Sequence, residues 1–262
     1  MNEPLMPDRQ PGETPGPARE NQRSPARAAL AETPWLAGVT PATLDMLAAQ
    51  AVVHRVPPGA LLFDHAEAPN FAQFLLEGSI ELLGVHGEAE TLIELLLPGD
   101  MVIPAAVVSD MPYLMRARVH AEARLLLVRA AVFREALTAD ASLCFAVLQC
   151  QAAQFRRQVR QAKNLKLRAA EERVGCYLVA MFGEQKADFS VRLPMEKRLI
   201  ASQLGMTRET FSRALASMSR FSVRIDGDSV HVLDAAPLRA RFPLDRLIDQ
   251  REPIGLWPSQ SS

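Results

Sequence analysis

The chain has few of the residues that build covalent frameworks or metal sites. Its 262 residues include three cysteines, Cys144, Cys150 and Cys176, and no Cys-x-x-Cys pair. A sparse, odd set of this kind is typical of reduced, unpaired thiols. The five histidines are scattered and form no His-x-His pair. We therefore expect neither a disulfide scaffold nor a bound metal, and a cupin-like metal enzyme is only a remote alternative.

Long apolar runs and catalytic loops are also missing. No stretch of about 18 uncharged apolar residues occurs, so we expect no membrane span and no membrane partner. The first residues lack the basic-then-apolar pattern of a signal sequence, which predicts a cytoplasmic location. Neither Gly-x-Ser-x-Gly nor a Walker loop is present, and we do not expect an enzyme.

Charge is distributed unevenly along a chain whose net charge is only −1. Residues 156–220 carry 14 Lys/Arg and 6 Asp/Glu, a net charge of +8, whereas residues 1–155 carry 10 and 18, a net charge of −8. A basic segment in an acidic chain indicates a part that meets a polyanion, with a solvated helical face as the alternative.

The first part of the chain is rich in Pro, Gly, Glu, Arg and Ser. Such a composition buries too little apolar surface to offset chain entropy, so residues 1–33 are predicted to be a disordered arm. Residues 41–48 have apolar side chains at helical spacing, and Thr40 is suited to cap that helix.

A series of short apolar runs separated by Gly, Pro and Asp follows, up to residue 128. This pattern predicts a sandwich, jelly roll or small barrel. The predicted strands are Val52–Val56, Leu61–Phe63, Phe74–Leu76, Ile80–Leu83, Thr91–Leu97, Ala117–Val119 and Leu125–Val128.

Helical spacing returns after residue 128, with a short helix at Val132–Leu137 and a long one from about Ala141 to Leu165. On the long helix the apolar residues recur at near-heptad intervals, and we interpret them as a dimer seam, with packing on their own domain as the alternative. They are Leu143, Val147, Cys150 and Ala153. We interpret Cys144 and Cys150 as inert thiols, and a redox switch is the alternative.

Residues 193–218 have the pattern of a helix-turn-helix. Ala201 provides the small residue at the helix crossing, and Gly205 allows positive φ in the turn. Thr207 is placed to cap the second helix. This helix would present Arg208, Glu209, Ser212 and Arg213 on one outward face, with side chains suited to base edges; an ordinary surface helix is the alternative.

An alternating segment, Val223–Leu233, follows the second helix and contains Asp226-Gly227. Alternation around Asp-Gly predicts a β-hairpin. A hairpin directly after a helix-turn-helix is typical of the wing of a winged helix, which touches phosphates.

In the order of these parts, residues 35–240 resemble the Crp/Fnr superfamily of bacterial regulators. The resemblance implies an α+β fold with a cyclic-nucleotide-binding-like β-roll (34–138), a dimerisation helix (139–166), a winged helix-turn-helix (167–238) and a C-terminal tail (239–262). It also implies a homodimer that binds double-stranded DNA, with RNA polymerase as a further partner.

The recognition helix carries the most specific part of the resemblance. Glu209, Ser212 and Arg213 match the Glu-x-x-Ser-Arg face with which the Fnr branch reads TTGAT-type half-sites. Arg208 matches the Arg that precedes this Glu in the catabolite activator branch, so the face is a hybrid. Lys197 falls where the family often has a phosphate contact.

The resemblance leaves the sensor's cofactor or ligand unknown. The segments at Ile103-Pro104 and Met115-Arg116 lack the Gly-Glu and Arg-Ser pairs of cAMP-binding members, which argues against cAMP. Residues 1–143 contain no Cys, which argues against the iron–sulfur cluster of Fnr. Haem, as in relatives that sense nitric oxide or carbon monoxide, and a degenerate, ligand-independent sensor stay open. Candidate haem ligands are His54, His65, His86, His120, Met101 and Met115.

Overall fold

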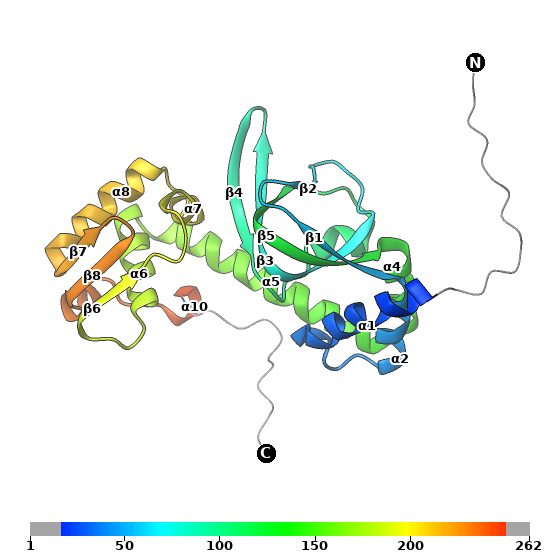
Figure 1. Ribbon diagram of the computed structural model, residues 1–262. Helices are drawn as coiled ribbons and strands as arrows, with labels where there is room; N and C mark the ends of the chain where they lie inside the picture. Colours follow the sequence, from blue (N-terminus) through cyan, green and yellow to red (C-terminus); the bar gives the residue numbers. More distant parts are fainter. Residues whose placement is uncertain (1–16, 250–262) are drawn as a thin grey trace, which may run out of the picture.

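The computed structural model describes residues 17–249, with the side chains of residues 25–249, and it has two folded parts joined by one long helix (Figure 1). The N-terminal part contains α1 (Pro17–Glu32), η1 (Pro34–Leu36), α2 (Pro41–Gln50), β1 (Ala51–Val56), β2 (Leu61–Phe63), β3 (Phe71–His86), β4 (Ala89–Leu96), α3 (Pro104–Ser109), β5 (Arg116–Arg129) and α4 (Ala130–Ala139). Within the described residues, no helix is both long and apolar enough to cross a bilayer.

The strands of this part form one antiparallel sheet with the order β1-β5-β3-β4, and β2 also pairs with β5. Two pairs of expected short strands are in fact two long ones, β3 and β5. Glu77-Gly78, which separates two of the expected strands, is an irregularity within β3, where the register against β5 shifts and Gly78 has φ +84°. Glycine accommodates this backbone conformation without ending the strand.

The prediction of a disordered arm over residues 1–33 is wrong for its second half. Pro17–Glu32 forms helix α1, and Ala26, Ala29 and Leu30 are buried against the β-roll. Residues 1–16 lie outside the described part. The polar average composition of the arm hid a small apolar helix face, whose burial helps to offset the entropy of ordering the segment.

The interior of the β-roll is filled with apolar side chains. Phe63 stacks on Tyr113 at a ring-centroid distance of 3.6 Å, and Val102 and Ala106 pack into the same cluster. Ala106 belongs to α3, a short helix that the sequence pattern did not predict; it begins after Ile103, which has φ +41°.

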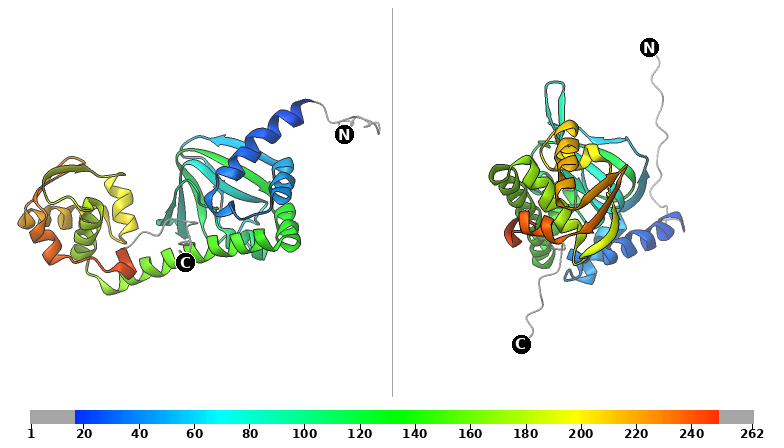
Figure 2. Two further views of the ribbon diagram at one scale, coloured as in Figure 1. Left: turned by 90° about the horizontal axis from the view of Figure 1, so that it is seen from below. Right: turned by 90° about the vertical axis from the view of Figure 1, so that its left-hand side faces the viewer.

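Helix α5 (Ala141–Leu167) runs beneath the β-roll and continues into the C-terminal part (Figure 2). The sequence predicted the wrong face of α5 as the dimer seam. Leu143, Val147 and Cys150 are buried in the core of their own domain. A different apolar stripe is exposed on α5, with steps of three and four residues. It consists of Phe145, Leu148, Ala152, Phe155, Val159 and Ala162, and we call it the α5 stripe.

The C-terminal part contains α6 (Ala170–Phe182), β6 (Ala187–Arg192), α7 (Lys197–Gln203), α8 (Arg208–Ser217), η2 (Met218–Phe221), β7 (Val223–Asp226), β8 (Ser229–Asp234), α9 (Ala236–Arg241) and α10 (Arg246–Asp249). The predicted hairpin is β7–β8, and β6, which was not predicted, adds a third strand beside β8. A separate core around Phe182, Phe211 and Phe242 holds these elements together.

The expected C-terminal tail is folded over its first residues. Helix α10 packs on α5 and α6, and Asp249 accepts two hydrogen bonds from Arg168, at 2.6 and 2.7 Å. Residues 250–262 lie outside the described part. A carboxylate that forms two parallel bonds with a buried guanidinium makes a strong local anchor.

Candidate nucleic-acid interface

The turn between α7 and α8 has the geometry that the sequence pattern requires. Ala201 is buried at the helix crossing, and Gly205 has φ +62° in the turn. The side chain of Thr207 accepts a hydrogen bond from the backbone N–H of Thr210 and so caps α8. This cap satisfies one of the N–H groups that a helix N-terminus otherwise leaves without a partner.

Helix α8 has one buried and one exposed face. Phe211, Ala214 and Leu215 pack into the domain core, where Leu215 fills space beside the small Ala214. The residues predicted to read bases are all exposed: Arg208, Glu209, Ser212 and Arg213. The core contacts thus fix the helix, while four polar side chains stay available to a ligand.

Charge on this exposed face is preorganised. A hydrogen bond from its own backbone N–H and one from the Thr207 hydroxyl lower the pKa of the Glu209 carboxyl, and the nearby Arg208 and Arg213 act in the same direction. Glu209 is therefore a carboxylate at neutral pH and acts as an acceptor only. An arginine–carboxylate face of this kind can match both donors and acceptors on base edges.

Lys197, at the start of α7, contacts the wing. Its ammonium donates to the carbonyl of Gly227 in the β7–β8 turn, at 2.6 Å. Because an ammonium has three donors, two remain for other acceptors such as phosphate oxygens. On β6, Ser190 lies 2.6 Å from Nδ1 of His231 on β8, which ties the unpredicted strand to the hairpin.

The tip region of the β3–β4 hairpin packs against α7, a contact that no sequence motif indicated. The backbone N–H of Leu92 donates to the hydroxyl of Ser202 at 3.1 Å, and Arg198 lies 3.6 Å from buried Glu81. Leu92 also packs with Leu199. The helix-turn-helix is therefore in direct contact with the sensor domain.

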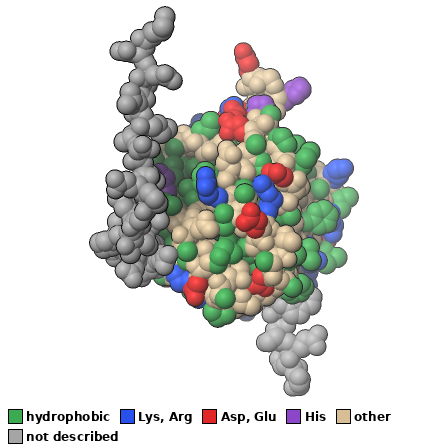
Figure 3. Space-filling model, turned by 90° about the vertical axis from the view of Figure 1, so that its right-hand side faces the viewer, with side chains coloured by type: hydrophobic (Ala, Val, Ile, Leu, Met, Phe, Trp, Pro, Cys, Tyr) green, Lys and Arg blue, Asp and Glu red, His purple; other side chains and the backbone are tan. Residues whose placement is uncertain are grey.

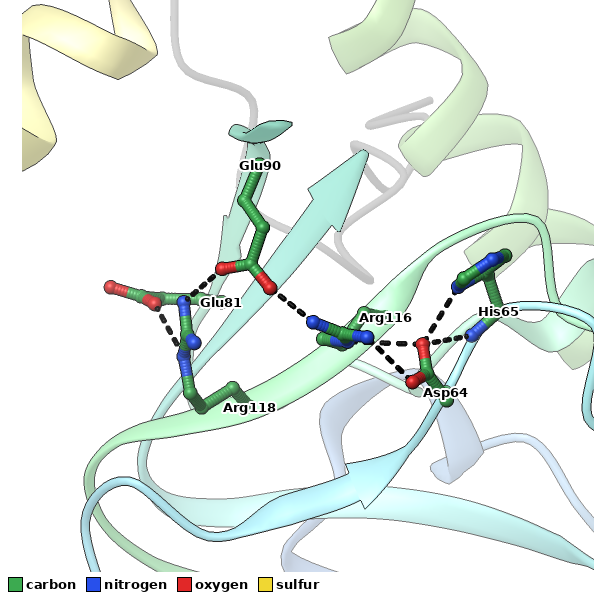
Figure 4. Close-up of polar contacts among 6 residues, drawn as sticks. All are labelled: Asp64, His65, Glu81, Glu90, Arg116 and Arg118. Atoms are coloured by element: carbon green, nitrogen blue, oxygen red, sulfur yellow. Dashed lines mark hydrogen bonds and ion pairs between the residues drawn. The ribbon is translucent and has the colours of Figure 1, made fainter. Parts of the chain in front are cut away.

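Two arginines of the sensor domain, Arg116 and Arg118, pair with carboxylates within the domain (Figure 4). Arg116 binds Asp64 through two nitrogens, at 2.6 and 3.0 Å, and also Glu90. Arg118 pairs with Glu90 at 3.0 Å and with Glu81 at 3.4 Å. Hydrogen bonds from Arg116 and His65 hold the pKa of Asp64 well below its usual range. These cations are already occupied by anions.

Three of the candidate haem ligands have other contacts or are buried in the core. His65 pairs with Asp64 and His120 with Glu81, while Met101 is fully buried in the core. In the described part of the chain, no three His, Cys, Asp or Glu side chains are grouped so as to hold a metal ion. The face of the sensor domain shown in Figure 3 mixes acidic, basic and apolar side chains rather than gathering one charge.

Two family models match the chain in sequence. The cyclic nucleotide-binding domain matches residues 53–140, and the Crp-like helix-turn-helix domain matches residues 172–241. No curated protein matches it.

Several solved structures have the same fold. FixK2 from Bradyrhizobium japonicum is 19% identical with a TM-score of 0.59, and the match covers 78% of this chain and 99% of that chain. The c-di-GMP-responsive regulator CLP from Xanthomonas campestris is 16% identical, with a TM-score of 0.62 and coverages of 74% and 99%. A CooA mutant from Carboxydothermus hydrogenoformans is 14% identical, with a TM-score of 0.59 and coverages of 73% and 88%.

The two family models together match more than half of the chain, and they match it over the two folded parts of the structure. Proteins with this combination of domains are transcription regulators rather than enzymes, and their helix-turn-helix binds DNA. The chain therefore belongs to the Crp/Fnr family of DNA-binding transcription regulators.

Proposed function

We propose that the protein is a homodimeric regulator that reads an inverted repeat of TTGAT-like half-sites, as in the Fnr and FixK-like branch. The observation that carries this proposal is the outward face of α8, where Glu209, Ser212 and Arg213 are exposed and the opposite face is buried in the core. Arg213 is suited to guanine O6 and N7, and Glu209 to cytosine N4. Thr207 and Arg208, at the N-terminus of α8, would contact the DNA backbone or the outermost base of the half-site.

The α5 stripe supports a two-fold dimer. Its side chains recur at heptad spacing on the face of α5 that points away from the protomer's own core, and Phe145, Leu148 and Phe155 are each at least 60% exposed. A parallel pair of α5 helices would bury this stripe. The two recognition helices would then lie about one DNA turn apart, with half-sites roughly 10 bp centre to centre.

For the sensor we propose a signal other than cAMP. The ion pairs of Arg116 and Arg118 and the filled β-roll interior support this proposal, because a cyclic phosphate would have to displace carboxylates from both arginines. Contact with RNA polymerase is proposed from the family alone. Haem stays an alternative cofactor, and a Soret band in the visible spectrum of the purified protein would reveal it.

The test of DNA reading compares two variants in a binding-site selection at fixed salt. Arg213→Ala should cost about 1–3 kcal/mol per half-site and relax the preference at one base, because it removes a guanine contact. Lys197→Ala should weaken binding to all sequences and reduce the slope of affinity against salt, because a phosphate contact carries no base information.

The matched control is Arg220→Ala, which removes an exposed arginine that pairs with Glu171 off the recognition face. It should change neither base preference nor the ranking of sequences. If Arg213→Ala kept both the affinity and the base preference of the parent protein, the assignment of α8 as the reading element would be wrong.

A further inference from the structure

A cavity lies between the β-roll and the DNA-binding domain, apart from the interior of the β-roll. Its volume is about 470 Å³. Its walls come from β4 and the Pro98–Asp100 turn of the sensor, from α5, and from α6, α7 and α10 of the C-terminal part. Cavities of this size are typical of sites for small organic molecules.

One wall of the cavity is apolar and poorly covered. Ile93, Leu95, Leu97 and Pro98 of the sensor lie there with Met195 of the DNA-binding domain. Leu97 is 51% exposed and Ile93 is 37% exposed. A molecule with an apolar body would remove this surface from water, which favours binding.

The part of α6 that lines the cavity carries a positive charge without a carboxylate partner in the described part of the chain. Arg157, which also lines the cavity, pairs with Glu94 at 2.8 Å and with Asp100 at 2.9 Å. The guanidinium of Arg173 instead donates to the backbone carbonyls of Arg168 at 2.9 Å and of Gly205 at 3.4 Å. These carbonyls accept from the two terminal nitrogens, whereas Nε has no hydrogen-bond partner and no carboxylate of the described residues pairs with the guanidinium. Burial lowers the pKa of Arg173, the direction expected for a desolvated cation without an anion.

We propose that this interdomain cavity is the effector site, and that its effector is a small amphipathic monoanion. The apolar body would lie against Leu95, Leu97 and Met195, and a carboxylate or similar head would face Arg173. The regulatory role of this site rests on the proposed function as a DNA-binding regulator. Binding of the ligand to the cavity does not depend on that function.

The position of the cavity explains how occupancy would act on DNA binding. Its walls belong to two domains that are joined by α5 and a short linker after Leu167. A ligand that fits only one relative orientation of the domains stabilises that orientation. Because Gln203 and Leu204 of the helix-turn-helix line the same cavity, this orientation also sets the placement of α8.

The test uses two fluorescent probes with the same aromatic body on the full chain without DNA. 8-Anilinonaphthalene-1-sulfonate carries one negative charge and N-phenyl-1-naphthylamine carries none. We expect saturable binding of the sulfonate, one per chain, and weaker binding of the neutral probe. Arg173→Gln should abolish the difference between the two probes, because the preference comes from that charge.

Two tryptophan variants locate the probe. Ala180 is exposed on α6 and lines the cavity, so Ala180→Trp should fill it and weaken sulfonate binding by about tenfold or more. Ala240→Trp, on the exposed side of α9 outside the cavity, should bind as the parent does. Unchanged sulfonate binding in Ala180→Trp, or no saturable binding in the parent protein, would overturn the proposal that this cavity is a binding site.

A truncation and a DNA measurement complete the test. If the probe bound only after removal of residues 250–262, the chain's own C-terminus would be the occupant and the proposal would be overturned. A saturating concentration of the sulfonate should change the affinity for an inverted-repeat duplex by about fivefold or more. Probe binding without that change would overturn the role as effector, whereas no DNA binding even without probe would contradict the proposed function instead.

Discussion

Gly78 is the residue on which the continuity of strand β3 depends. It has φ +84°, and a Cβ at this position would overlap the carbonyl oxygen of Glu122 and lie 2.8 Å from Cα of Ala123. Both neighbours belong to the backbone of β5 and cannot rotate away. The close approach of two backbones explains why a glycine interrupts an otherwise apolar strand.

Gly78→Ala should lower the free energy of unfolding by about 2–5 kcal/mol, the sum of backbone strain and overpacking. Gly87→Ala is the matched control, because Gly87 has φ +58° but faces open space. The free energy of unfolding of Gly87→Ala should fall by only about 1–2 kcal/mol. Urea unfolding of both variants at one protein concentration gives the comparison, and equal losses would contradict the clash.

The buried thiol of Cys150 gives a pH dependence with a defined sign. Burial raises its pKa to about 12, above the ordinary thiol value. Between pH 9 and 12 the unfolded chain therefore releases a proton that the folded chain retains, and stability falls as the pH rises. The fall approaches about 1.4 kcal/mol per pH unit for one thiol.

Cys150→Ala should make the free energy of unfolding fall less steeply with pH between 8.5 and 10.5, whatever its effect at neutral pH. Cys144→Ala is the matched control, since Cys144 is an exposed thiol on the same helix. It should leave the slope as in the parent protein. The measurement is urea unfolding at a series of pH values, and an unchanged slope in Cys150→Ala would show that this thiol ionises when folded.

At the scale of elements, helix α5 has apolar side chains on two opposite faces. Leu143, Val147 and Cys150 hold it to its own β-roll, and the α5 stripe leaves the opposite face apolar and exposed. A helix that is apolar on two faces must bury both, and one protomer supplies a partner for only one of them.

Phe155→Glu should convert the dimer to a monomer at micromolar concentration, because it places a charge in the centre of the paired stripe. Sedimentation velocity measures the result. Leu114→Glu is the control, since Leu114 lies outside α5 and, at 88%, is the most exposed large apolar side chain among residues 25–249. A Phe155→Glu protein that sediments as a dimer would place the interface elsewhere.

At the scale of the whole molecule, the DNA-binding domain contacts both the sensor and the helix that joins the two domains. The β3–β4 hairpin touches α7 through Leu92 and Ser202. Helix α10 of the DNA-binding domain packs on α5, and its Asp249 binds Arg168 just before α6 begins. This ion pair anchors α10 beside the linker between the two domains.

Asp249→Ala should release α10 and cost about 1–3 kcal/mol, since Arg168 loses its carboxylate but can turn toward water. Hydrogen exchange should increase in α10 and around residues 165–173 and stay unchanged in the β-roll. Asp228→Ala, at the exposed wing turn, is the control and should leave exchange in those segments unchanged. Equal exchange in both variants would mean that the ion pair does not anchor α10.

The sequence by itself determined the elements whose rules are local. The helix-turn-helix could be predicted because Ala201, Gly205 and the Thr207 cap each follow from contacts within a few residues, and the wing because Asp226-Gly227 defines a tight turn. The outward face of α8 followed from the same 3.6-residue period that placed Phe211 inside.

Only the tertiary structure decided which apolar face meets which partner. Periodicity on α5 predicts that apolar faces exist, but two sets of residues fit a heptad, and the β-roll selected Leu143 and Val147 for its own core. Helix α1 was missed because its burial depends on surfaces that α2 and β1 supply. The pairing of Arg116 with Asp64 was missed because strands bring distant charges together. These outcomes depend on long-range contacts, whose free energy no local pattern contains.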